Sequence, residues 1–177
     1  MTISQPEPWL RGPVPGIPAL LQPAAHALLL ALEELEATVS ELTVDQLWLE
    51  PGGAASLGFH LVHLAGSTDR LLTYARGESL SAAQRADLAA ERALAPPYPS
   101  LDELLIGWRT TVEAALRQLA STPEATLTNA RLVGRAQLPS TVLGLMFHAA
   151  EHAQRHVGQI VTTAKIIRGI GSGGANS

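Results

Sequence analysis

The sequence predicts an all-α protein that folds as one domain, and three observations carry this prediction. The chain has 177 residues, which suits one domain with a sizeable core. Hydrophobic residues make up 46% of the chain but aromatic residues only 4%, so leucine and alanine must fill the core. Such a core favours the packing of helix on helix over the packing of strands. Apolar residues also recur at helical spacing in four long segments, which are residues 18–41, 57–76, 101–120 and 141–168.

Residues 1–17 form a proline-rich N-terminal arm. They contain four prolines, and proline removes the backbone N–H group that a helix needs. We expect Trp9 to hold this arm against the rest of the protein. In the helix over 18–41, Pro23 lies within the first turns, so the helix either starts later or bends there. His26 lies on this helix and is interpreted as a surface or partly buried residue.

Capping and breaking residues set the limits of the second long helix. Thr43 can cap a short helical turn, and the Pro-Gly-Gly sequence at 51–53 then breaks the chain. Ser56 is the candidate N-cap of the helix over 57–76. Gly77 follows as its stop, because glycine readily takes the left-handed conformation that ends many helices.

A connector over residues 78–99 leads to the third long helix. Residues 81–93 of this connector can form a helix that the following prolines end. Ser100 and Glu103 then form a capping box, which predicts the start of the helix over 101–120.

The segment between the third and fourth long helices has no helical period. Residues 122–138 therefore form either a small hairpin, with 127–130 pairing with 131–137, or a loop. The last helix follows over 141–168. Residues 169–177 are rich in Gly and Ser and form a flexible C-terminal tail, so the four-helix domain spans residues 18–168.

Composition excludes several classes of function. The formal net charge of −4 argues against binding to the phosphates of a nucleic acid. The chain has no cysteine, which excludes disulfides, cysteine-ligated zinc and a protein thiol nucleophile. The first residues lack a basic region followed by an apolar run, and the apolar run over 24–35 is too short for a membrane span. We therefore expect a cytoplasmic protein that binds neither nucleic acid nor membrane.

Three histidines of the last helix, His148, His152 and His156, stand four residues apart. On a helix each lies one turn beyond the previous one, displaced by only about 40° around the axis. Rings buried in line are costly, because each ring nitrogen needs a partner and each ring can take a charge near neutral pH. A metal ion removes both costs, since neutral imidazole is a common ligand of zinc, nickel, copper and iron. We expect this helix to supply two ligands of a divalent metal site.

Helical periodicity ranks the histidines by their distance from the apolar stripe of each helix. On the last helix, His156 lies nearest the stripe, His152 slightly farther and His148 farthest, which favours the first two as ligands. On the second helix, His60 lies nearer the stripe than His63. Spacing alone therefore favours His60 as the inward residue of that helix.

Two segments carry a resemblance to a known family. The pattern from Ser56 to His63-Leu-Ala, and the later pattern from Leu143 through His152 to His156-Val-Gly-Gln-Ile, resemble the DinB-like family. The resemblance implies a four-helix bundle of up-down-down-up type with long crossovers, and a three-histidine metal site. Matched residue by residue, the metal ligands are His63, His152 and His156. We favour His63 over His60 on this ground, and His60 is kept as the alternative.

The resemblance also implies a function. Members of the family look like thiol-dependent transferases, hydrolases or isomerases, and three neutral imidazoles leave coordination positions open, as in catalytic zinc sites. We therefore expect a metal-dependent, thiol-dependent transferase or hydrolase that acts on a small-molecule substrate. Zinc or nickel is the expected metal, and a small thiol is the expected cosubstrate. Candidates for orienting the ligands by hydrogen bonds are Asp69, Glu151 and Gln159.

Two other interpretations stay open at this point. A non-catalytic metal-binding or stress-response bundle would act as a homodimer, with the metal face covered by side chains or by a partner. An enzyme instead needs a pocket of a few hundred Å³ beside the metal. A plain helical scaffold would hold no metal. The Leu- and Ala-rich stripe of the first helix would suit a dimer if it were exposed, and we expect a homodimer.

Overall fold

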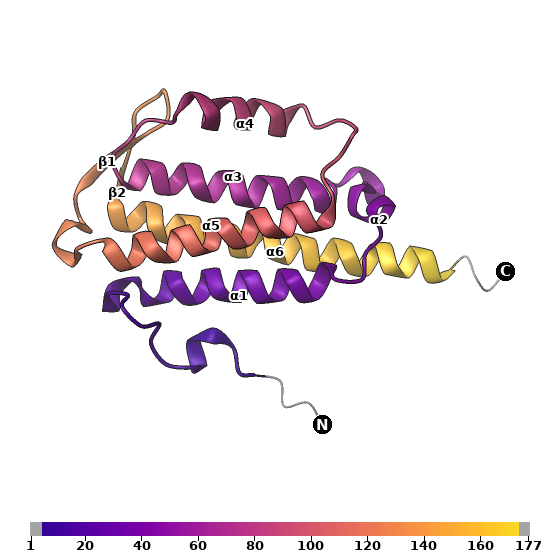
Figure 1. Ribbon diagram of the computed structural model, residues 1–177, viewed down its shortest axis with the longest axis horizontal. Helices are drawn as coiled ribbons and strands as arrows, with labels where there is room; N and C mark the ends of the chain where they lie inside the picture. Colours follow the sequence, from indigo (N-terminus) through magenta and orange to yellow (C-terminus); the bar gives the residue numbers. More distant parts are fainter. Residues whose placement is uncertain (1–4, 174–177) are drawn as a thin grey trace.

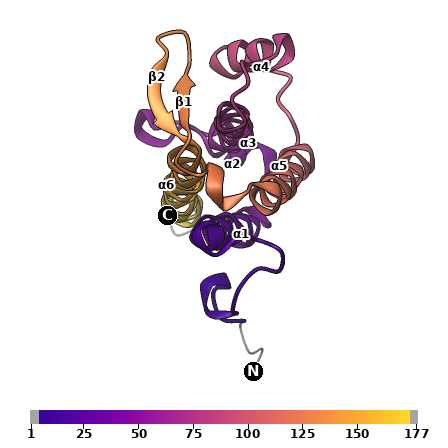
Figure 2. The same cartoon turned by 90° about the vertical axis from the view of Figure 1, so that its left-hand side faces the viewer.

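The computed structural model describes residues 5–173 and is mostly helical. Four long helices lie side by side (Figure 1), and the end-on view of Figure 2 shows them grouped around a shared interior. They are α1 (Gln22–Val39), α3 (Leu57–Ala75), α5 (Leu101–Ser121) and α6 (Val142–Gly173). The connections carry two shorter helices, α2 (Val44–Trp48) and α4 (Ala82–Arg92). A hairpin of β1 (Ala130–Val133) and β2 (Leu138–Thr141) precedes α6.

Local capping sets the helix limits much as the sequence predicts. The hydroxyls of Thr43, Ser56 and Ser100 each accept a hydrogen bond from the backbone N–H three residues further on. Gly77 ends α3 with a φ of 82°, the left-handed conformation that glycine tolerates. Pro23 lies in the first turn of α1, where its missing N–H costs little. The helix therefore starts later than Pro18, at Gln22.

The N-terminal arm is held differently from the prediction. Trp9 remains 58% exposed, so the expectation that it holds the arm is wrong. Arg11 does so instead: its guanidinium donates to both carboxylate oxygens of Glu33 on α1, at 2.6 and 2.7 Å. Pro8 is buried beside it. A forked guanidinium matches a carboxylate with two hydrogen bonds, which an indole cannot do.

The hairpin uses other residues than predicted. Ala130 pairs with Thr141 and Val133 with Leu138, so the pairing of 127–130 with 131–137 is wrong. Gly134 and Gln137 take positive φ values of 67° and 50°, and these conformations place the turn after Val133.

The last helix also extends beyond the predicted end at Arg168. Residues 169–173, expected to belong to a flexible tail, continue α6. Ile167 is buried, and Arg168 donates a hydrogen bond of 2.6 Å to the backbone carbonyl of Thr38 in α1, so the end of α6 is held against the bundle. The rest of the predicted tail, residues 174–177, lies outside the described residues.

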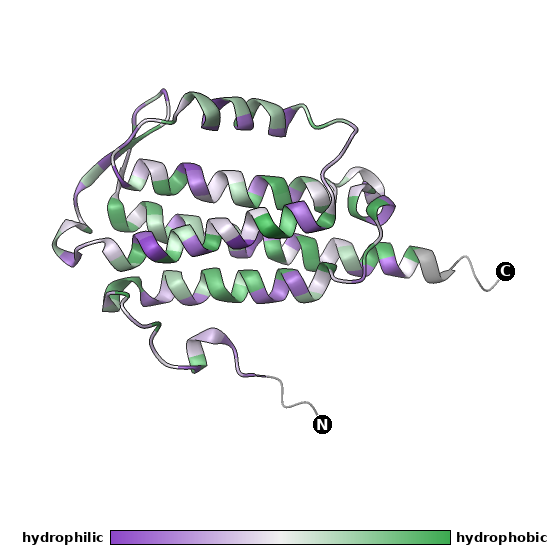
Figure 3. Cartoon of the chain, viewed as in Figure 1, coloured by the Kyte–Doolittle hydropathy of each residue, from purple (hydrophilic) through white to green (hydrophobic). Residues whose placement is uncertain are grey.

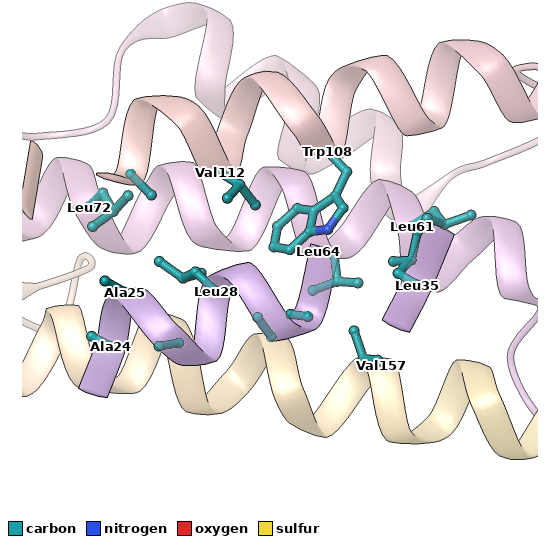
Figure 4. Packing of buried hydrophobic residues seen from close by; sticks show 14 of the residues in the cluster. Ala24, Ala25, Leu28, Leu35, Leu61, Leu64, Leu72, Trp108, Val112 and Val157 are labelled. Atoms are coloured by element: carbon teal, nitrogen blue, oxygen red, sulfur yellow. The ribbon is translucent and has the colours of Figure 1, made fainter. Parts of the chain in front are cut away.

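Leucine and alanine fill the interior, as the composition predicts. Figure 4 shows Trp108 of α5 lying among leucines and valines of the neighbouring helices, and its side chain is fully buried. Each long helix carries both hydrophobic and hydrophilic residues along its length (Figure 3), as expected of a helix with one buried face. The stripe of α1 that would suit a dimer if exposed is largely core, because Leu28, Ala31 and Leu35 are buried. Among the described residues, every helix is too short or too polar to span a bilayer.

Candidate metal centre

The centre of the candidate site lies where α3 packs against α6. The Nε2 atoms of His63 on α3 and His152 on α6 are 3.0 Å apart. His156, one turn after His152, completes the group, and its ring centroid lies 4.6 Å from that of His63 and 4.5 Å from that of His152. One ligand atom from each ring lies within 4.8 Å of the other two. The three residues expected to bind the metal are therefore close enough together to hold one ion.

His60 joins this cluster from the turn of α3 that precedes His63. Its side chain is only 6% exposed, so spacing correctly ranked it as the inward residue. Its Nδ1 atom lies 3.0 Å from Nδ1 of His156. Because residues three apart share one face of a helix, α3 presents both histidines to α6. The choice of His63 over His60 correctly predicted the ring that meets His152. It did not predict that the ring of His60 contacts α6 as well.

The other two histidines lie outside the group. The side chain of His148 is 49% exposed, and its Nδ1 atom lies 3.2 Å from Glu151. Its ring centroid is 5.6 Å from that of His152. His26 on α1 instead approaches the N-terminal arm, with Nε2 3.0 Å from the carbonyl oxygen of Gly12. This contact ties His26 to the arm, in keeping with its interpretation as a surface or partly buried residue.

Glu91 of α4 is the functional candidate that the sequence analysis missed. Its carboxylate accepts a hydrogen bond of 2.5 Å from Nδ1 of His63 and one of 3.0 Å from Arg70. It is 6% exposed, which is unusual for glutamate unless its charge is paired. The sequence gives only the spacing that places Glu91 on the same face of α4 as Gln84, seven residues earlier. The structure alone shows that this face meets α3, through the hydrogen bond from Gln84 to Asp69.

The residues proposed as orienting groups make other contacts. Asp69 accepts from Gln84, and Glu151 accepts from Arg155 and pairs with exposed His148. Gln159 is exposed. The carboxylate that orients a ring of the site therefore comes from α4, a separate segment, and neither from α6 nor from α3.

Burial favours the neutral form of His60, His152 and His156. It lowers the pKa of His156 to about 4, with the nearby His152, His63 and His60 adding to the effect. The pKa values of His60 and His152 are also lowered, mainly by burial. Burial alone would raise the pKa of Glu91, but the hydrogen bond from His63 and the charge of Arg70 outweigh it and lower the pKa. At neutral pH the site thus combines the neutral imidazoles of His60, His152 and His156, whose lone pairs can bind a cation, with the ionised carboxylate of Glu91.

A cleft of about 310 Å³ lies beside the histidines. Its lining includes Phe59, Glu91, and the stacked rings of Trp48 and Tyr98, whose centroids are 4.2 Å apart. Phe59 also lies parallel to the ring of His63, with centroids 5.8 Å apart. None of the three histidines lines the cleft, so it reaches the cluster through Phe59 and Glu91.

Comparison with known proteins identifies one family. The model of the DinB superfamily matches residues 27–160, a range that runs from α1 into α6 and includes all four clustered histidines and Glu91. No curated protein matches the chain.

Proposed function

The chain belongs to the DinB superfamily, and from this premise we propose that it is a metal-dependent enzyme. His63, His152 and His156 bind a divalent ion, with zinc or nickel as the metal. The observation that carries the proposal is the convergence of three imidazoles from α3 and α6, each offering a ligand atom within 4.8 Å of the others. Neutral imidazoles suit zinc and nickel better than the hard cations magnesium and calcium.

The second nitrogen of each ring supports this assignment. Nδ1 of His63 donates to Glu91 and Nδ1 of His156 contacts His60, which leaves Nε2 of both rings for the metal. Nδ1 of His152 is buried and has no hydrogen-bond partner among the described residues. A buried ring nitrogen without a partner is costly, so this ring needs an ion or a water molecule to complete its bonding. Outer hydrogen bonds of the kind made by Glu91 fix the tautomer and orientation of a metal-binding histidine.

The expected reaction is transfer or hydrolysis with a small thiol as cosubstrate. When bound, the metal supplies Lewis-acid chemistry, and three protein ligands leave room for a further group. The thiol must come from a small molecule, because the chain has no cysteine. In this proposal the cleft beside Phe59 holds the substrate, and the stacked Trp48 and Tyr98 offer an apolar surface to it. Glu91, on the cleft wall, keeps His63 oriented.

We also propose that the four long helices form the up-down-down-up bundle. Support comes from the chain direction in Figure 1, where α1 and α6 run one way and α3 and α5 the other. The homodimer and the cytoplasmic location remain predictions.

Elemental analysis of protein purified without a histidine tag tests metal binding. We expect about one metal ion per chain in the unaltered protein and almost none in His152→Ala. His148→Ala is the matched control, because it removes an exposed histidine of the same helix, and it should keep the metal. Full occupancy in His152→Ala would contradict the assignment, and an unaltered protein without metal would favour the plain scaffold.

Activity of the metal-loaded protein tests the reaction class. A panel of small thiols is offered with an electrophilic aryl halide, and thiol conjugation is followed by absorbance, with His152→Ala as the control. Ester and amide substrates test hydrolysis in parallel.

One observation favours the non-catalytic alternative: none of the three histidines lines the neighbouring cleft. A metal-binding dimer would keep its ion but show no turnover in either assay. Light scattering of the same samples would then give a mass of two chains.

A further inference from the structure

A second and larger cleft lies on the side of the molecule that carries α4 and the hairpin. Its volume is about 1140 Å³, and its walls are α4, the β1–β2 hairpin and the end of α3. Figure 2 shows α4 above α3 and the hairpin beside it, above α6. The histidines do not line this cleft. We propose that it binds a small anionic molecule that carries carboxylate or phosphate groups on an apolar skeleton.

Charge is the first argument for an anion. Four arginines line the cleft, out of only 12 lysines and arginines in a chain of net charge −4. They are Arg85 and Arg92 from α4, and Arg131 and Arg135 from the hairpin. Arg92 also lines the smaller cleft beside Phe59. The one carboxylate on the lining is that of Glu78, which accepts a 2.8 Å hydrogen bond from Arg76. A strongly positive site has thus formed on a protein that is negative as a whole.

The hydrogen-bond partners of these arginines are the second argument. Elsewhere in the described chain, six arginines pair with a carboxylate: Arg11, Arg70, Arg76, Arg109, Arg117 and Arg155. In the cleft, Arg85 donates to the backbone carbonyl of Leu80, and Arg131 donates to those of Ala75 and Ala130. A carbonyl orients a guanidinium but does not neutralise it. Across residues 5–173, Arg92 and Arg135 have no carboxylate partner at all.

The arginines of α4 are spaced so that they lie on one face of this helix, which lines the cleft. Arg85, Leu88 and Arg92 follow one another at i, i+3 and i+7, so their side chains share a face and line the same cavity. The neighbouring face carries Gln84 and Glu91, which bond to α3. Anchoring by α3 holds the arginine face toward the hairpin.

Apolar side chains between the arginines define the rest of the ligand. Tyr74, Leu80 and Leu88 line the cleft, and Leu132 of the hairpin is 53% exposed. An exposed leucine among cations suits a ligand whose skeleton is apolar and whose acidic groups reach the guanidinium forks. Guanidinium groups bind carboxylates and phosphates with paired hydrogen bonds, so the charge pattern accommodates both acids.

Calorimetric titration of the full-length, metal-loaded protein tests the proposal with two probes. Phthalate carries two carboxylates on a benzene ring, and phenyl phosphate carries one phosphate on the same ring. The neutral analogue phthalamide is the ligand control. We expect saturable binding of one anion per chain and no binding of phthalamide. The ratio of the two affinities shows whether carboxylate or phosphate is preferred.

Two double variants with the same loss of charge separate the cleft from general electrostatics. Arg85→Gln/Arg135→Gln should weaken anion binding by about tenfold or more, because it removes two charge-assisted donors that line the larger cleft and not the smaller one. Arg109→Gln/Arg117→Gln removes two paired arginines of α5 and should change binding by less than about twofold. Thermal unfolding midpoints equal to that of the unaltered protein would show that both variants keep the fold.

Three outcomes would overturn the proposal: no binding of either anion at about millimolar concentration, equal weakening in both double variants, or loss of binding in His152→Ala. The last would place the anion at the metal centre. Because the cleft contains no histidine, the inference does not rest on the proposed metal, and His152→Ala should bind the anions as the unaltered protein does.

Discussion

The carboxylate of Glu91 accepts a 2.5 Å hydrogen bond from Nδ1 of His63, although the two residues lie 28 positions apart on different helices. Helix α4 lies on the outside of the bundle (Figure 1), and this contact connects it to the histidine cluster. The pKa of Glu91 is lowered despite its burial, so the carboxylate is ionised and His63 is the donor. Nε2 of the same ring lies 3.0 Å from Nε2 of His152, so the contact orients His63 toward the cluster.

Glu91→Gln should weaken metal binding by about 10- to 100-fold without abolishing it. Glutamine can still accept from His63, but it lacks the negative charge that makes the imidazole a stronger ligand. Competition with a metal-binding dye measures the change. Glu151→Gln is the matched control, because Glu151 holds the exposed His148 and Arg155 and should leave the metal affinity unchanged. Equal affinities of Glu91→Gln and the unaltered protein would show that this contact does not tune the site.

His60→Ala should keep one metal ion per chain and lower its affinity, whereas His63→Ala should lose the ion. The reason is that His60 reaches the cluster through Nδ1 of His156, 3.0 Å away, and acts as a support for that ring. Elemental analysis after dialysis against buffer distinguishes the two variants. The reverse result would make His60 the ligand and His63 the support, as helical spacing alone suggested.

The metal-free protein should lose stability as the pH falls from about 6.5 to about 4. In the unfolded chain His156 takes up a proton near its ordinary value of 6.5, but burial lowers its pKa in the folded protein to about 4. Between these values the unfolded state binds more protons, so acidification favours unfolding. Glu91 acts in a lower window, since its folded pKa lies below the ordinary 4.5 and its contribution is lost only as the pH falls below that value.

Urea unfolding of metal-free protein at about pH 7.5, 6 and 5 measures this dependence. His156→Gln should reduce the loss, because its side chain does not titrate. A free energy of unfolding that is the same at the highest and lowest pH would contradict the prediction.

Two glycine substitutions should act in opposite directions. A Cβ at Gly58, in the first turn of α3, would lie 2.6 Å from the indole of Trp48, which stacks on Tyr98. Gly58→Ala should therefore destabilise the fold by about 1–3 kcal/mol through overpacking. A Cβ at Gly107, inside α5, would meet nothing within 4 Å. Gly107→Ala should stabilise by about 0.5–1 kcal/mol, because alanine loses less backbone entropy in a helix.

Thermal or urea unfolding of the two variants tests both signs against the unaltered protein. Destabilisation by Gly107→Ala, or a neutral effect of Gly58→Ala, would show that these local contacts are described wrongly. Fluorescence of the tryptophans gives a second signal, since only Gly58→Ala should displace the indole of Trp48.

The sequence alone determined where α2, α3 and α5 start, because the interactions that set these starts are local. The hydroxyls of Thr43, Ser56 and Ser100 accept hydrogen bonds from backbone N–H groups only three residues away, so capping can be predicted from neighbouring residues. Where local signals were weaker, at the hairpin turn and at the end of α6, the predicted limits differed from those observed. A buried Ile167 and a bond from Arg168 to α1 extend α6, and neither depends on local sequence.

The sequence by itself also indicated which histidines meet. His63 follows from its match to a family pattern, against the helical spacing, and His152 and His156 follow from both. Only the tertiary structure decided that His60 contacts His156, that Glu91 supports His63, and that four arginines from two segments face one cleft. The physical reason is that spacing ranks residues around one helix axis but says nothing about the rotation and distance of the next helix. Those depend on how the leucines and alanines of all the long helices pack together.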